Sequence, residues 1–165
     1  MFVLFYMNNE YATTKITIPQ EIIIKSDIYK VAKVDEKKLF NVMANITNYP
    51  KILPDNYVKV RLINQTNNTI YTEEVVVGKG IKTKVLVKHM FFPFSKHVME
   101  LLDGDAKGSI IVATYEKNET GTHVHLNIEA HLHGLFIPLG NVIQYGLESM
   151  AKNVINSFIE YTEKN

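Results

Sequence analysis

The sequence predicts a single α+β domain in which a curved antiparallel sheet of seven strands wraps a long C-terminal helix, with two short helices after the first strand. Apolar residues recur with a period of two in short segments between residues 57 and 133, and turn residues separate these segments. The spacing becomes helical at residues 35–46 and again after Pro138. The 165 residues suffice for one core, so we expect one domain over residues 20–165 after an N-terminal extension at residues 1–19.

The first strand is predicted from Glu21 to Val31, where isoleucines recur at alternating positions. The segment Asp35–Asn45 then has helical spacing, and Asp35 is placed to cap its first turn. Pro50 and Pro54 follow at a separation of four residues, which allows only a single helical turn between them. These two helices are therefore expected to be short.

Six further strands and one long helix complete the prediction. Turn residues such as those at 67–68, 78–80, 103–104 and 118–121 separate the strands, which are expected at Tyr57–Asn64, Thr69–Val77, Ile81–Met90, Lys96–Leu102, Ser109–Glu116 and Thr122–His133. After Pro138, apolar residues at helical spacing predict a helix of about twenty residues. Its apolar stripe must lie on the sheet, because both surfaces would otherwise face water.

Composition excludes several function classes. The formal net charge is +1, from 18 basic and 17 acidic residues, so no global field favours nucleic acid and we expect no nucleic-acid partner. The chain contains no cysteine, which removes disulfides, thiolate catalysis and cysteine-bound zinc. We expect a cytoplasmic protein on this basis. The sequence carries no signal for an oligomeric state.

Two stretches carry a resemblance to a known family. The segment YKVAKVDEKKLFNVMANITNYPKILP at residues 29–54 resembles the way in which the polyketide cyclase/dehydrase and coenzyme Q-binding branch of the START-like (SRPBCC) superfamily enters its first helix and a Tyr-Pro turn. The stretch from Leu102 to Ile159, which ends in MAKNVINSFIEY, is similar to the last strands and closing helix of that superfamily. The resemblance covers about residues 20–162.

The resemblance implies the helix-grip fold, also called Bet v 1-like, with a cavity between the sheet and the last helix. The superfamily contains lipid-transfer and ubiquinone-binding proteins, plant hormone receptors, ribosome-association toxins and aromatase/cyclases. Its shared motifs are structural, so they imply a cavity and no particular reaction. No cofactor is expected.

Strand periodicity indicates which residues face this cavity. In the strand from Ile81 to Met90, three lysines share one side and must face solvent, so Val85, Val87 and His89 face inward. The apolar row of the last strand and the stripe of the final helix face the same space. The expected ligand-binding residues are Val85, Val87, His89, Phe91, Phe92, Phe94, Leu126, Ile128, Ala130, Leu132, Ile143, Leu147 and Met150.

Two loops are unusually apolar. Phe91–Phe94 contains three phenylalanines, which either gate the cavity or plug one end of the core. Gly134–Gly140 is a second apolar loop, which is either a lid beside the final helix or plain packing. Both loops also suit a transient contact with a membrane.

Four histidines of the last strand share one side with a carboxylate. Residues two apart on a strand are about 6 to 7 Å apart, a spacing that lets two imidazoles share a metal ion. This side is opposite the apolar row, so it is expected on the convex surface, where a polar surface without function, a metal site and a pH-dependent contact all remain open. The residues concerned are His123, His125, Glu129, His131 and His133.

No nucleophile elbow, phosphate loop or dinucleotide fingerprint occurs. The best candidate for acid/base chemistry is His89, with Tyr71 or Glu73 of the neighbouring strand as partner. Three functions therefore stay open. The sequence favours binding or carriage of a hydrophobic molecule (a lipid, an isoprenoid or quinone, or a polycyclic compound). The alternatives are a cyclase or dehydratase acting in the same cavity and a module that binds a protein partner.

Overall fold

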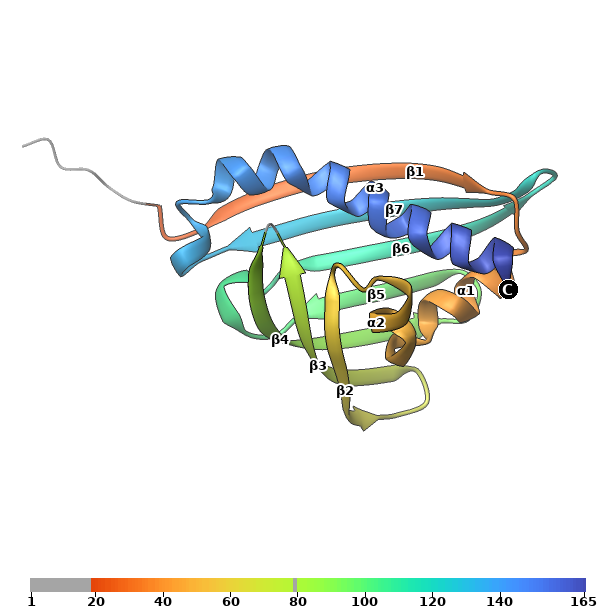
Figure 1. Ribbon diagram of the computed structural model, residues 1–165, viewed down its shortest axis with the longest axis horizontal. Helices are drawn as coiled ribbons and strands as arrows, with labels where there is room; N and C mark the ends of the chain where they lie inside the picture. Colours follow the sequence, from red (N-terminus) through yellow and green to blue (C-terminus); the bar gives the residue numbers. More distant parts are fainter. Residues whose placement is uncertain (1–18, 79) are drawn as a thin grey trace, which may run out of the picture.

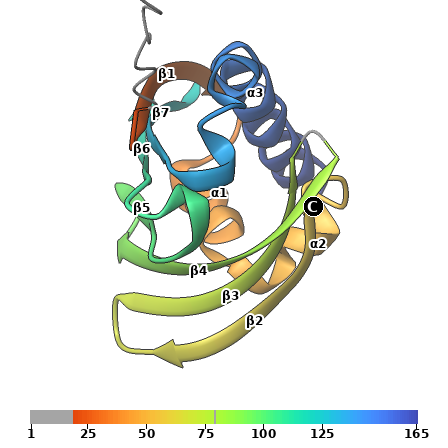
Figure 2. The same cartoon turned by 90° about the vertical axis from the view of Figure 1, so that its left-hand side faces the viewer.

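The computed structural model describes residues 19–78 and 80–165. Seven strands form one antiparallel sheet in the order β1-β7-β6-β5-β4-β3-β2, so β1 and β2 are its edges (Figure 1). The sheet curves around the helices (Figure 2). The expected N-terminal extension falls, apart from its last residue, outside the described residues.

The elements follow the predicted order, and the predicted fold class is confirmed. The strands are β1 (Ile22–Ala32), β2 (Tyr57–Gln65), β3 (Thr69–Gly78), β4 (Ile81–Phe92), β5 (Lys96–Leu101), β6 (Ile110–Asn118) and β7 (Gly121–Leu132). The helices are α1 (Glu36–Ala44), α2 (Tyr49–Ile52) and α3 (Gly140–Lys164), with short 3-10 turns η1 (Ile46–Asn48), η2 (Gly104–Ala106) and η3 (Gly134–Phe136).

Local chemistry explains the first helix. The Asp35 side chain accepts hydrogen bonds from the backbone N–H groups of Lys37 and Lys38, two donors that a helix start leaves without partners. Leu39 and Met43, one turn apart on the helix, are buried. The cap therefore fixes where α1 begins, and the apolar face fixes how it packs.

The main core lies where α1 and α3 meet the β1–β7 side of the sheet. The buried stripe of α3 includes Leu147, Ala151, Ile155 and Phe158. This helix runs along β1 in both views (Figures 1 and 2). The strands β3 to β5 lie farther from it, so the concave face is covered unevenly.

Candidate functional site

The register of the β3–β4 hairpin decides which side chains enter the concave space. Gly78 pairs with Ile81, so even-numbered residues of β3 share a face with odd-numbered residues of β4. Thr72 and Glu74 therefore lie on the same side as His89, and all three are buried. Chain geometry alone has placed a carboxylate beside a histidine inside the protein.

These residues form a connected polar cluster with His97 of β5. The Thr72 hydroxyl donates to Glu74 Oε1 at 2.8 Å, and His89 Nε2 lies 2.9 Å from the same oxygen. On the other side of its ring, His89 Nδ1 lies 3.1 Å from His97 Nε2. We call these four residues the buried polar cluster. None is more than 2% exposed, so its contacts are protected from water.

Burial controls the protonation of the cluster. It holds the pKa of His97 well below the ordinary histidine value, and the neighbouring His89 lowers this pKa further. His97 is therefore neutral near pH 7. The same environment acts on Tyr57, whose pKa is raised well above its ordinary value by burial and by the nearby Glu74.

The direction of each hydrogen bond follows from what each group can donate. As a carboxylate, Glu74 only accepts, so His89 Nε2 carries the proton of that contact. On the other side of the ring, His89 Nδ1 faces His97 Nε2, so one of these two nitrogens donates the hydrogen bond and the other accepts it. The other His97 nitrogen, Nδ1, is a buried side-chain atom with no partner.

Three half-buried apolar residues lie next to the cluster. Met99 and Leu101 follow His97 on the concave side of β5, and Ile111 pairs with Met99 from β6. Met99 also lies opposite His89 on β4. We call Met99, Leu101 and Ile111 the concave apolar patch. Its side chains point inward yet keep contact with solvent, so the helices leave this part of the sheet incompletely covered.

One flank of α3 matches this patch in character. Ile143, Met150 and Val154 lie beside the buried stripe of the helix, and each keeps some solvent exposure. Tyr161 continues this flank toward the C-terminus, and its ring lies 5.5 Å from Lys51 Nζ of α2. This flank therefore faces the side on which α2 packs and not the outer surface beyond β1.

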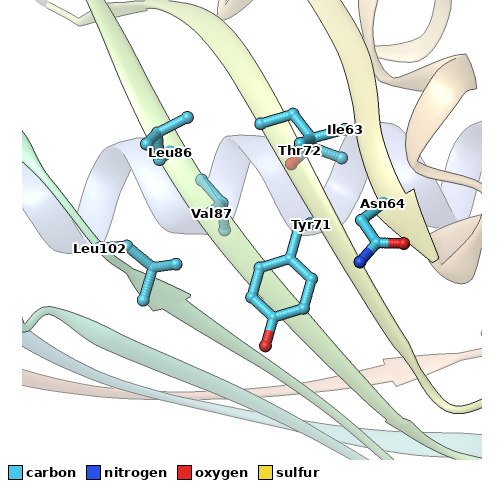
Figure 3. Close-up of a pocket in the computed structure, with 7 residues that line it drawn as sticks. All are labelled: Ile63, Asn64, Tyr71, Thr72, Leu86, Val87 and Leu102. Atoms are coloured by element: carbon cyan, nitrogen blue, oxygen red, sulfur yellow. The ribbon is translucent and has the colours of Figure 1, made fainter. Parts of the chain in front are cut away.

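The structure also has hollows on both faces of the sheet. One, of about 330 Å³, lies between the α1–η1 connection and the concave side of β2 and β3, and Thr72 of the buried polar cluster is among its lining residues. The other has a volume of about 400 Å³ and is lined by Tyr71, Leu86 and Leu102 among others (Figure 3). Tyr71 and Leu86 are outward-facing residues of β3 and β4, so this second hollow opens on the convex face.

The residues predicted to bind ligand fall into two groups. Those on β4 and β7 that were expected to face inward are buried in the structure, as is Leu147, while Ile143 and Met150 of α3 keep some exposure. The buried residues are Val85, Val87, His89, Leu126, Ile128, Ala130, Leu132 and Leu147. Packing thus fills the deep part of the expected cavity with side chains, and the half-buried part lies nearer β5 and β6.

The phenylalanine turn between β4 and β5 packs at the α1 end of this space. The rings of Phe91 and Phe94 meet Phe40 of α1 edge to face, with centroids 6.4 Å and 5.7 Å apart. Phe91 also stacks on His97 at 4.5 Å. Phe92 points away and is 45% exposed, beneath the Lys96 ammonium group.

The helices among the described residues do not contain a segment suited to crossing a membrane.

The expected partners of His89 need correction. Tyr71 pairs with Lys88 and Glu73 with Leu86, so both lie on the convex face, opposite His89. Glu73 instead binds Arg61 and Lys84, which lower the pKa of its carboxyl group. The partners that the structure supplies are Thr72, Glu74 and His97. The sequence does not predict these three partners, because periodicity along single strands sets neither the register between β3 and β4 nor the faces of β5.

The histidine row lies on the convex face and is occupied by acidic and polar partners. His131 lies between Glu21 and Glu129, at 2.6 Å and 2.9 Å, and these contacts raise its pKa. His125 binds Asp27 at 2.7 Å. His123 contacts the Asn118 amide, and His133 contacts the Lys107 carbonyl and Glu21. Among residues 19–78 and 80–165 no cluster of three or more such side chains is arranged to hold a metal ion.

The architecture is that of a helix-grip protein: a curved antiparallel sheet, two short helices after the first strand and a long closing helix. Neither a family model nor a curated protein matches the sequence. Solved structures match the fold and confirm the resemblance to START-like folds.

Three of these structures show how similar the fold is and how low the sequence identity is. The di-domain ARO/CYC StfQ from the steffimycin biosynthetic pathway has a TM-score of 0.74 at 9% identity, over 86% of this chain and 51% of that chain. The Zhui aromatase/cyclase from Streptomyces sp. R1128 has a TM-score of 0.69 at 11% identity, over 87% of this chain and 95% of that chain. Ara h 8.0201 has a TM-score of 0.67 at 13% identity, over 87% and 99%. The chain thus spans about half of the di-domain protein, and these identities establish the fold alone.

Proposed function

We propose that this protein binds a hydrophobic small molecule between the concave apolar patch and the exposed flank of α3. The observation that supports this most strongly is the partial solvent exposure of inward-facing Met99, Leu101 and Ile111. Apolar side chains on the inside of a curved sheet gain free energy when water leaves them, by about 25 cal/mol per Å² of apolar area. A ligand of mainly hydrocarbon character supplies that burial. Its natural counterpart is a lipid, an isoprenoid or quinone, or a polycyclic compound.

A pair of neighbouring variants on β5 tests this proposal. Met99→Glu places a carboxylate on the concave side, whereas Val98→Glu places one on the opposite face of the same strand, because adjacent strand residues point to opposite sides. Binding of the neutral apolar dye N-phenyl-1-naphthylamine is measured by fluorescence, with thermal unfolding to verify that both variants fold. We expect Met99→Glu to weaken dye binding by roughly tenfold or more, since burying a charge is costly. Equal effects of the two variants would reject the concave site.

The buried polar cluster supports a second candidate function, acid/base catalysis of the cyclase or dehydratase kind. Both ring nitrogens of His89 are already in contact with Glu74 or His97, so His89 is a positioning residue here and His97 Nδ1 is the base. Removal of a proton next to a carbonyl group by this nitrogen would form an enolate, which recovers a proton in the reverse step. Deuterium uptake from heavy water into 2-tetralone, followed by NMR, measures this exchange. Uptake at the uncatalysed rate, or equal uptake with His97→Leu, would reject the enzyme.

A further inference from the structure

The atom left over by the hydrogen-bond order of the cluster marks a recognition point. Buried polar atoms almost always have a partner, because an unpaired one costs free energy. Hydrogen bonds connect the four side chains of the buried polar cluster, and His97 Nδ1 is a buried atom of the cluster without a partner. Among the buried side-chain nitrogen and oxygen atoms of the described residues, His97 Nδ1 is the one without a hydrogen-bond partner.

The chemical character of this atom follows from its neighbours. We infer that His89 Nε2 donates to the Glu74 carboxylate and that His97 Nε2 donates to His89 Nδ1, which leaves the free nitrogen at the far end, His97 Nδ1, as an acceptor. The depressed pKa of His97 keeps its ring neutral near pH 7, so one of its two nitrogens carries a proton and the other a lone pair. The atom therefore lacks a donor, and a carbonyl or ether oxygen in a ligand would leave it unpaired.

The position of His97 connects it with the proposed binding surface. His97, Met99 and Leu101 occupy successive concave positions of β5, which are about 6 to 7 Å apart along the strand. A molecule that covers Met99 and Leu101 thus reaches the ring of His97 at one end. Phe91 of β4 stacks on that ring with centroids 4.5 Å apart and is itself half-buried.

We propose that the ligand carries a hydroxyl group at one end of its apolar body, and that this hydroxyl donates a hydrogen bond to His97 Nδ1. This inference rests on the proposed function and makes it more specific: the ligand class is an apolar alcohol, phenol or enol. The buried polar cluster then acts as a fixed acceptor. Glu74 and His89 hold the proton of His97 on Nε2 and keep Nδ1 available.

Two probes of nearly equal shape test the hydroxyl. 1-Naphthol donates one hydrogen bond, whereas 1-methoxynaphthalene has the same ring system and no donor. Their dissociation constants are measured by calorimetry on the full chain. We expect 1-naphthol to bind about fivefold more tightly after correction for its greater solubility in water, since a buried hydrogen bond to an otherwise unpaired acceptor is worth about 1 kcal/mol.

Variants connect this preference to one residue. His97→Leu should remove the preference for 1-naphthol while leaving the affinity for 1-methoxynaphthalene within about twofold, because the apolar contacts remain. His123→Leu removes a histidine from the convex face and should keep the preference. An unchanged preference in His97→Leu would overturn the inference.

A measurement on the unaltered protein covers the case in which His97→Leu fails to fold. The ¹⁵N resonance of His97 Nδ1 should move in the direction of a hydrogen-bonded acceptor when 1-naphthol is added, and should not do so with 1-methoxynaphthalene. If both probes bind equally and the resonance stays unchanged, the hydroxyl inference fails while the binding function stands. A water molecule permanently bound at Nδ1 would give that result. If neither probe binds, the proposed function fails and the inference fails with it.

Discussion

The two buried histidines differ in what their ring nitrogens contact. His89 is in contact on both sides, so it holds its neighbours in place, whereas His97 has one nitrogen left for a ligand. The sequence singled out His89 because it lies on the inward side of a strand with a clear pattern of lysines. It did not single out His97, which follows a lysine in a short strand without such a pattern. The acceptor therefore depends on contacts between strands that periodicity along one strand does not report.

Register explains why Glu74 was missed. A hairpin in which Gly78 pairs with Ile81 places even positions of β3 beside odd positions of β4. The sequence-based expectation pairs His89, an odd position of β4, with the odd positions Tyr71 and Glu73 of β3. These two residues face the side of the sheet opposite His89. The glycines at 78 and 80 could have predicted this register, because they indicate a short turn and a two-residue turn between strands fixes which residues pair.

The convex histidines lead to a prediction about pH. The contacts of His131 with Glu21 and Glu129 raise its pKa above the unfolded value, so the stability that they contribute is fully present below about pH 6.5 and is lost as the pH rises through the folded-state pKa. Lys25, which also binds Glu129, and His133, which also lies near Glu21, share these carboxylates. We expect the His131 contribution to the free energy of unfolding to fall between about pH 6 and pH 8.

Urea unfolding of the wild type and of His131→Gln across this range measures the contribution as the difference between the two proteins. The difference should shrink as the pH rises. His123→Gln provides the control, because His123 contacts the Asn118 amide and the described residues give it no ion pair with a carboxylate. A difference for His131→Gln that stays constant with pH, or grows as the pH rises, would show that the contacts with Glu21 and Glu129 do not stabilise the charged ring.

At the level of elements, the sequence predicted strands and helices well where one face of the element is buried. Strand β7 alternates along nearly its whole length, and its buried positions are apolar except for Thr122. The capped start of α1 was equally clear, because Asp35 precedes an apolar helical pattern. The partial solvent exposure of the inward-facing residues of β5 and β6 was not predictable, since it depends on how far α3 lies from those strands.

The cap of α1 gives a prediction at this scale. Asp35→Ala removes the acceptor for two backbone N–H groups, so we expect the free energy of unfolding to fall by about 1 kcal/mol. Asp55→Ala is the control, because Asp55 is an exposed aspartate outside any helix start. Chemical denaturation of both variants measures the effect. An effect on Asp35→Ala no larger than that on Asp55→Ala would contradict the role of the cap.

At the scale of the whole molecule, the two sides of the curved sheet differ in chemistry. The convex face carries ion pairs and histidine contacts, such as those of Glu73 and His131, which interact with solvent and with one another. The concave face carries mainly apolar side chains, and the buried polar groups of Thr72, Glu74, His89 and His97 are gathered there in one cluster. A fold that separates the two in this way places hydrogen-bonding groups at one end of an apolar surface, an arrangement suited to a ligand with one polar end.

The uneven cover of the concave face is the basis of the proposed function. Helix α3 packs closely along β1, and α1 with the phenylalanine turn fills the end near Tyr115. The concave apolar patch lies between these two covered regions, next to His97. We therefore expect a ligand to bind at the concave apolar patch and not in the hollow on the convex face.

Methyl-resolved NMR of the labelled protein during addition of 1-naphthol tests this claim most directly. The account predicts that the methyl resonances of Met99, Leu101 and Ile111 shift together and saturate, while those of Val98 and Ile110, their neighbours on the convex face, change little. Shifts confined to convex residues such as Leu86 and Leu102, or no saturable shift at any methyl group, would contradict it.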